Sequence, residues 1–307
     1  KVGVNTDCKC SNNGACDASG QCVCNAGFFG ADCSLTAADV AQKNQIVTAS
    51  LDIITLSASS TTEPTLSAVS TKSQILSSVL QDATTLDPTT AAKAVTALQS
   101  TITSLAQVVA SAGTDDAALN LVHKLLNGTA NIQSKASNPA SFVNIVDSMT
   151  SVLSSFAVAV GQQKVLANDK LVVAVQKIDT TQTNSNAQTV IPAPPGVQAA
   201  PSATIPLSSI PSTSGSTATI NSAFYVNSPY PAPTNETAAS GVFSVSVYGS
   251  GAEIAMKNLT NPVNLTIPLA NGFDISSLQT DPTKPGYVAV CKYLDKATQQ
   301  WLSDGCV

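Results

Sequence analysis

The sequence predicts a multidomain chain with three structural parts: a small disulfide-rich module, an α-helical bundle and an antiparallel β-sandwich. Six of the eight cysteines lie within the first 33 residues, apolar residues then recur at helical spacing, and apolar and polar residues alternate near the end. A chain of 307 residues is long enough for two or three such parts. We expect the module at 1–34, the helices at 35–180, a Pro/Ser/Thr-rich connection with short strands at 181–238 and the β part at 239–307.

The cysteines of the first part are crowded into a short stretch: Cys8, Cys10, Cys16, Cys22, Cys24 and Cys33. This density is typical of an oxidising compartment, where disulfides replace a core that is too small to hold itself together. A zinc site built from Cys-x-Cys pairs is the competing interpretation, and it is weak because the only histidine, His123, is far away in the sequence. Six cysteines permit many pairings, so their spacing alone does not fix the connectivity.

The residues between the cysteines carry a family resemblance. Asn13-Gly14 precedes Cys16, and Cys22-Val-Cys24 leads through Gly27-Phe28-Phe29-Gly30 to Cys33. Over residues 8–33 this pattern resembles the EGF-like family, above all its short tenascin- and laminin-like forms. The resemblance implies the disulfides Cys8–Cys16, Cys10–Cys22 and Cys24–Cys33. The acidic lead-in of calcium-binding members is absent, so we expect no calcium site. We also expect no other metal and no cofactor. We expect Phe28 and Phe29 to contact a neighbouring module or subunit.

The second part is expected to be helical from about Ala37 to Ile178. Apolar residues recur at spacings of three and four along several seams. Asp87-Pro88 and Asn138-Pro139 each place a cap residue before a proline, which predicts helix starts, whereas Gly113 and Asn127-Gly128 predict stops. Either the bundle packs only on itself, or its low-charge seams also pack against neighbouring subunits. The main seams are Val95, Leu98, Ile102, Leu105 and Val109, then Phe142, Ile145, Met149, Leu153, Phe156 and Val160.

The third part follows a segment rich in proline, serine and threonine between Thr180 and Thr234, a composition that favours extended backbone and O-linked glycans. Beyond it, Phe243, Val245 and Val247 alternate with serines, and the residues from Val263 to Leu269 alternate in the same way. This period of two predicts antiparallel strands with one solvent-facing side. Four sequons are expected to carry N-linked glycans, at Asn127, Asn235, Asn258 and Asn264.

A second resemblance lies at the C-terminal end. Cys291-Lys-Tyr-Leu-Asp is followed by Trp301-Leu-Ser-Asp-Gly-Cys306, and Asn258-Leu-Thr-Asn-Pro-Val-Asn-Leu-Thr precedes both. This resembles the start of the GPS motif that ends the GAIN domains of adhesion G-protein-coupled receptors and polycystin-like proteins. Such domains place a helical subdomain before a β-sandwich. The residues that resemble this motif end before its self-cleavage site, so no autoproteolysis is assigned to them. Cys291 and Cys306 are expected to pair with each other, to pair with another chain or to stay free.

Composition limits the function. Only 11% of the residues are charged, with a net charge of −5, so no basic stripe exists to bind nucleic acid or an anionic membrane. No run of about 18 apolar residues predicts a membrane span. Catalysis has little support, because the chain has one histidine, three glutamates and no phosphate loop or nucleophile elbow. Asp115-Asp116 is expected to compensate a helix dipole.

These observations predict a non-catalytic extracellular protein, secreted or at the cell surface, whose partners are proteins. The first hypothesis is a structural subunit of an extracellular fibre, matrix or ciliary hair of the mastigoneme kind, which contacts copies of itself or other extracellular subunits. The alternative is the ectodomain of a GAIN-containing adhesion or polycystin-like receptor. Ordered Pro/Ser-rich segments and few charges favour the first hypothesis, and the Trp-x3-Gly-Cys ending favours the second.

Overall fold

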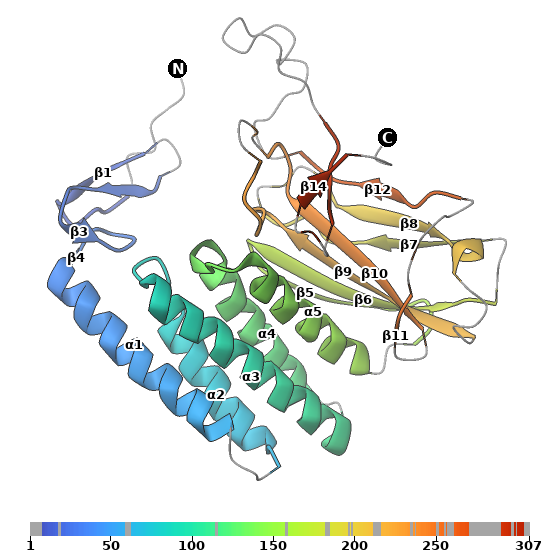
Figure 1. Cartoon of the computed structure of the whole chain (residues 1–307), viewed down its shortest axis with the longest axis horizontal. Helices are drawn as coiled ribbons and strands as arrows, with labels where there is room; N and C mark the ends of the chain where they lie inside the picture. Colours follow the sequence, from blue (N-terminus) through green and yellow to red (C-terminus); the bar gives the residue numbers. More distant parts are fainter. Residues whose placement is uncertain are drawn as a thin grey trace, which may run out of the picture.

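The computed structural model shows an N-terminal module, a layer of helices and two packed sheets (Figure 1). The fold class expected from the sequence is therefore confirmed. The structure describes residues 8–17, 20–58, 63–113, 116–156, 159–181, 185–195, 197, 199–210, 216–233, 236, 238–249, 252–254, 256, 261–269, 290–295, 298 and 300–303.

The helical layer consists of five long helices, with a 3-10 turn, η1, at Gln133–Lys135 after the fourth. Local capping explains where several of them begin. Asp87 and Asn138 accept hydrogen bonds from Thr90 N and Ser141 N, as their Asp-Pro and Asn-Pro pairs predict, and Thr65 caps another helix in the same way. Gly113, with φ of 87°, ends the third helix. The helices are α1 (Ala37–Ala58), α2 (Leu66–Val79), α3 (Pro88–Ala112), α4 (Asp116–Ile132) and α5 (Pro139–Ser155).

The larger sheet has five antiparallel strands in the order β11-β10-β9-β6-β5. Its two central strands are nine residues long and pair in register from Leu171 opposite Tyr225 to Asp179 opposite Thr217. Every residue of β6 from Leu171 to Val175 is buried, so both faces of this strand are covered. The strands are β5 (Gln163–Ala167), β6 (Leu171–Asp179), β9 (Thr217–Tyr225), β10 (Val242–Gly249) and β11 (Ala252–Glu253).

Two different layers cover the two faces of this sheet. Leu171, Val173 and Val175 point towards the helices and belong to the same hydrophobic cluster as α5. Val172 and Ala174 point the other way, onto a three-stranded sheet of order β12-β8-β7. The molecule is thus layered as helices, large sheet and small sheet (Figure 1). The small sheet is formed by β7 (Asn186–Val190), β8 (Ser202–Pro206) and β12 (Asn264–Thr266), with a 3-10 turn, η2 (Leu207–Ser209), after β8.

The helical part expected at 35–180 is wrong at its C-terminal end, because α5 ends at Ser155 and residues 163–179 form β5 and β6. Val160, the last residue of the expected seam, lies in a turn and is 51% exposed. A strand that is buried on both faces has no period of two, so its continuous apolar run is easily mistaken for a buried helix. The connection expected at 181–238 likewise contains the long central strand β9.

Two local expectations are also wrong. Gly128 does not stop α4, which continues to Ile132. A Cβ at Gly128 would lie 3.5 Å from the Leu80 side chain and 3.6 Å from that of Leu98, so this glycine lies where the helices pack closely. In the segment from Val263 to Leu269, the side chains of Leu265 and Ile267 are exposed and Pro268 is buried. Strand β12 is short, and among the described strands it pairs with β8 alone.

Candidate functional site

The cysteine module is held by three disulfides: Cys8–Cys16, Cys10–Cys22 and Cys24–Cys33. These are the pairs that the EGF-like resemblance implies. The first two connect the preceding residues to a hairpin of β1 (Gly14–Cys16) and β2 (Cys22–Cys24), and the third connects β2 to the following turn. Gly14 is required there, because a Cβ would lie 2.6 Å from the carbonyl oxygen of Val23 and 2.8 Å from the sulfur of Cys33.

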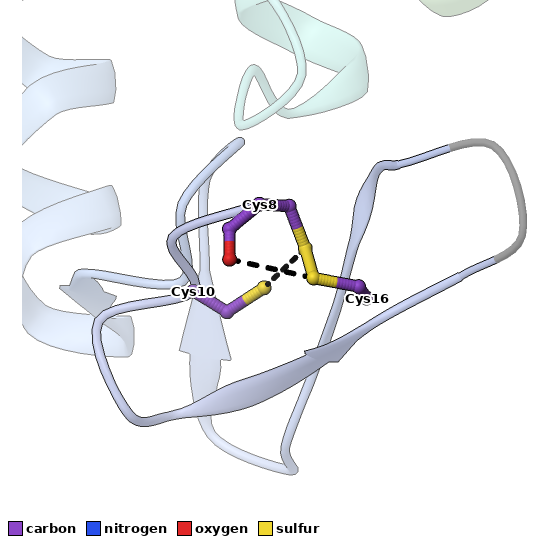
Figure 2. A group of neighbouring side chains, drawn as sticks. All are labelled: Cys8, Cys10 and Cys16. Carbon is purple, nitrogen blue, oxygen red and sulfur yellow. Dashed lines mark hydrogen bonds between the residues drawn. A yellow bond between two sulfur atoms is a disulfide. The ribbon is translucent and has the colours of Figure 1, made fainter. Parts of the chain in front are cut away.

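The sulfur atoms of the module approach one another closely, as metal ligands would. Cys8, Cys10 and Cys16 form one such group, in which the Cys8 and Cys10 sulfurs are 3.3 Å apart (Figure 2). Cys10, Cys22 and Cys33 form the other. Each of these sulfurs belongs to a disulfide and offers no thiolate, which is the form that binds zinc. The disulfides therefore account for the proximity of these sulfurs.

The module joins the helical layer without a linker. Strand β3 (Phe28–Phe29) pairs with β4 (Leu35–Thr36), and α1 begins at the next residue, Ala37. Asp39 accepts hydrogen bonds from both the hydroxyl and the backbone N–H of Thr36, and Thr36 Oγ1 accepts one from Asp39 N. This reciprocal arrangement is a capping box, and the bonds from Thr36 lower the pKa of the Asp39 carboxyl. This capping box was not predicted, although Thr36-x-x-Asp39 is the sequence pattern that indicates it.

The aromatic pair of the module is only partly available to a partner. Phe28 is half-buried and Phe29 is 41% exposed, because their strand lies against β4 and the start of α1. The expectation that both residues contact a neighbouring subunit remains a prediction, and Phe29 is the side chain better placed to do so.

A second exposed apolar surface, which we call the α1 stripe, was not expected from the sequence. Ile46, Ala49, Ile53 and Leu56 lie on the outer side of α1, and the three larger side chains are 60%, 64% and 72% exposed. The opposite side of α1 packs on α3 and α2. The spacing of three, four and three along the helix could have indicated this stripe.

The residues that catalysis would need are dispersed. His123 is exposed on α4, and Glu63, Glu236 and Glu253 are exposed in separate segments. Glu236 pairs with Lys292 at 2.6 Å, and Ser246 donates to Glu253 at 2.9 Å. Asp116 lies in the first turn of α4, as expected, whereas Asp115 lies outside the described residues.

The phenol of Tyr225 is buried beneath the helical layer. Burial raises its pKa well above the usual value, and the charges of Asp147 and Tyr230 raise it further. Its phenol is therefore neutral at physiological pH and does not act as a base.

The C-terminal residues form a small hairpin against the body of the protein. Strand β13 (Tyr293–Asp295) pairs with β14 (Gln300–Leu302). Trp301 donates its indole N–H to the carbonyl oxygen of Pro231 at 3.1 Å, and its ring meets that of Tyr230 edge-on at 6.2 Å. Cys291 is disulfide-bonded. The alternative in which Cys291 stays free is therefore wrong, and Cys306, one of the partners considered for it, lies outside the described residues.

The sequons fall in different environments. Asn127 is exposed in the middle of α4, and Asn264 is exposed on the edge strand β12. Asn235 and Asn258 lie outside the described residues. No helix within the described part of the chain has the length and apolar character that a membrane crossing requires.

Comparison with known proteins gives one clear match. Residues 7–33 match the family model described as EGF-like domain. No curated protein matches the chain. Among solved structures, the full extracellular region of zebrafish Gpr126/Adgrg6 is similar at 19% identity and a TM-score of 0.41, over 72% of this chain and 32% of that one. The chain thus spans about a third of that extracellular region, and a TM-score this low does not establish a common fold. Residues 7–33 of the chain form an EGF-like domain, the family of disulfide-rich modules that the cysteine pattern indicates.

Proposed function

We propose that this chain is the extracellular part of an adhesion-type receptor of the GAIN class, and that it acts by binding proteins. One observation carries the proposal: an EGF-like domain continues directly into a helical layer that covers an antiparallel sheet, and the chain then reaches the hairpin of β13 and β14. The helical part before the β part is the order that the GPS-like resemblance implies. In this proposal the module ends near residue 34, the helical part near Phe156, and the strands from Gln163 onward form the β part.

The geometry suits a protein that transmits mechanical force rather than one that catalyses a reaction. The capping box at Thr36 and Asp39 joins the module to α1, and α1 packs along α3. The C-terminal hairpin is joined to the body through Trp301, Pro231 and Tyr230. A load applied to the module would therefore pass through packed helices and the sheet to the C-terminal end. The dispersed acids and the exposed His123 support a non-enzymatic protein.

A fibre subunit is the second candidate, and the α1 stripe favours it. Three large apolar side chains, Ile46, Ile53 and Leu56, are exposed on one helix face, and a neighbouring copy would bury them in a polymer. Two further apolar side chains are exposed: Leu265 on the edge strand β12 and Ile267 just after it. Both candidates place the chain outside the cell, in agreement with its EGF-like domain and disulfides.

Fractionation of the native product separates the two candidates. Source cells are treated with protease from outside, lysed and extracted in turn with salt and mild detergent, and each fraction is probed with an antibody to this chain. A receptor ectodomain is cleaved by the protease added outside the cells, and detergent solubilises it whereas salt does not. Recovery of the product only in detergent-insoluble fibres visible by negative-stain microscopy would contradict the receptor proposal and support the fibre subunit.

The α1 stripe provides a second, independent test. Ile53→Ser and Leu56→Ser together are compared with the matched double variant Gln42→Ser and Gln45→Ser, which changes exposed polar residues of the same helix. Sedimentation of the purified chain at high concentration reports its association. If the chain polymerises and only the apolar pair abolishes this, the fibre proposal is supported. A monomer at all concentrations is the result expected of a receptor ectodomain.

A further inference from the structure

A polar groove of about 560 Å³ lies between α2, α4 and the turn that joins β5 to β6. Its walls carry amides and hydroxyls, and its charged groups are one lysine and one aspartate, so it has little net charge. Such a surface suits neither an anion nor a metal ion, but it matches the many hydroxyl groups of a neutral saccharide. The residues that matter here are Gln74, Ser77 and Ser78 on α2, Asn127 and Asn131 on α4, and Asn168 in the turn.

Asn127 is held in this groove in a defined orientation. Its carbonyl oxygen, Oδ1, accepts a hydrogen bond of 3.1 Å from the Nδ2 of Asn168. Asn168 is itself fixed, because its own Oδ1 accepts from the backbone N–H groups of Lys170 and Leu171, both at 2.9 Å. The bond from Asn168 engages the carbonyl end of Asn127, so a glycan on its amide nitrogen is compatible with this contact.

Asn127 also begins the sequon Asn127-Gly128-Thr129. In N-glycosylation, a bond forms between Nδ2 and C1 of the first sugar, while the bond from C1 to the diphosphate of a lipid-linked oligosaccharide breaks and the amide loses one proton. The carbonyl oxygen keeps its acceptor role, so the contact with Asn168 survives the reaction. Thr129 is buried in the folded chain and donates to the carbonyl oxygen of Leu125 at 2.8 Å. The transfer must therefore precede folding.

We propose that Asn127 carries an N-linked glycan whose first sugars lie in this groove. The sugar hydroxyls exchange hydrogen bonds with Gln74, Ser77 and Ser78 on one wall and with Asn131 on the other. The glycan then bridges α2 and α4 beside the β5–β6 turn, where the helical layer meets the sheet. This role differs from that of a glycan at Asn264, which would project from an exposed edge strand.

The experiment measures how well the groove protects the glycan. The full chain is secreted from cells that install N-glycans, and glycopeptide mass spectrometry measures occupancy at Asn127. An amidase that hydrolyses the bond between asparagine and sugar is then applied to the folded and the unfolded chain. Two or three hydrogen bonds to the first sugars should slow release from the folded chain by about tenfold or more. Thr129→Val, which removes the sequon and keeps the buried shape, should abolish occupancy.

Matched variants of α2 show whether the groove is responsible. Ser78→Tyr fills the groove, so it should leave occupancy unchanged and restore rapid release. Ser67→Tyr places the same side chain at an exposed position of α2 outside the groove and should leave release slow. The proposal is overturned if Asn127 carries no glycan, if release from the folded and unfolded chains is equally fast, or if both tyrosine variants behave alike.

Discussion

The EGF-like module and the body formed by the helices and sheets are stabilised in different ways. In the module, Cys10 and Cys33 are the buried apolar residues among those described, and three disulfides connect strands of two or three residues. The body instead has a continuous apolar cluster that runs from α1 through α5 to β6 and β9. Cross-links limit the entropy of the unfolded module, whereas burial of apolar surface stabilises the body. Each part should therefore fail under a different challenge.

The module and the body also differ in backbone conformation. Ser11, Asn12 and Cys33 adopt positive φ, and all three lie in the module. In the body, the described residues with positive φ are the glycines Gly113 and Gly161. Positive φ is costly for a residue with a side chain, so the module tolerates conformations that the body avoids. Ser11 and Asn12 lie between the disulfide-bonded Cys10 and Cys16, and Cys33 is itself disulfide-bonded, so cross-links hold these conformations in place.

The largest effect is expected from a cavity in the body. Phe224 is 1% exposed between the two sheets, and its ring meets that of Phe243 edge-on at 6.4 Å. Phe224→Ala should lower the free energy of unfolding by about 3–5 kcal/mol. Urea unfolding followed by far-UV circular dichroism measures the loss. Phe29→Ala in the module is the matched control, and its side chain is already 41% exposed. Equal shifts for the two variants would show that burial does not distinguish the parts.

The opposite experiment removes a cross-link from the module. Replacing both Cys24 and Cys33 by serine removes a disulfide between residues that are 9 positions apart in the sequence. The module should lose about 3 kcal/mol, while the body keeps its unfolding midpoint. Hydrogen exchange resolved by peptide measures both parts in one sample. Exchange that rises equally in α3 and in the module would contradict their independence.

The same contrast explains what the sequence predicts and what it does not. Cysteine density and Asp87-Pro88 are local signals, and they predict the disulfide-rich module and the helix start. The disulfide pairing follows from the EGF-like resemblance and not from the spacing of the cysteines. Leu171 to Val175 has no local signature that distinguishes a doubly buried strand from a helix. Gly128 looks like a stop until Leu80 and Leu98 are placed against it. The groove at Asn127 depends on Asn168, which only the fold brings near.

A smaller effect is expected at the junction between the two parts. Thr36→Ala removes the hydroxyl that both donates to Asp39 and accepts from its backbone N–H. The helix should lose about 1 kcal/mol at its N-terminus, and the module should become more mobile relative to α1. Thr65→Ala, which removes the cap of α2, is the matched control with a similar loss but no effect on the module. Peptide-resolved exchange of β4 and the first turn of α1 decides between them.

The smallest effect comes from an ion pair in the body. Lys43 on α1 donates to the carboxylate of Asp82 at 2.9 Å and to its backbone carbonyl at 3.0 Å. Burial alone raises the pKa of Asp82, but the hydrogen bonds from Lys43 and Thr84 and the charge of Lys43 outweigh it, so the pKa lies below the usual 3.8. Both side chains are partly exposed, which limits the contribution to about 1 kcal/mol or less.

This pair predicts a defined dependence on pH. Because the pKa of Asp82 is lower in the folded chain, the pair stabilises fully above the unfolded value of 3.8 and loses its effect as the pH falls through the folded pKa. Lys43→Met should therefore be less stable than the unmodified chain at pH 7, and the difference should shrink at low pH. Asp82→Asn should show the same loss at pH 7. Urea midpoints between pH 2.5 and 7 measure it, and a difference that persists unchanged at pH 2.5 would show that Lys43 stabilises the body through packing or its bond to the backbone carbonyl, not through the ionised carboxylate.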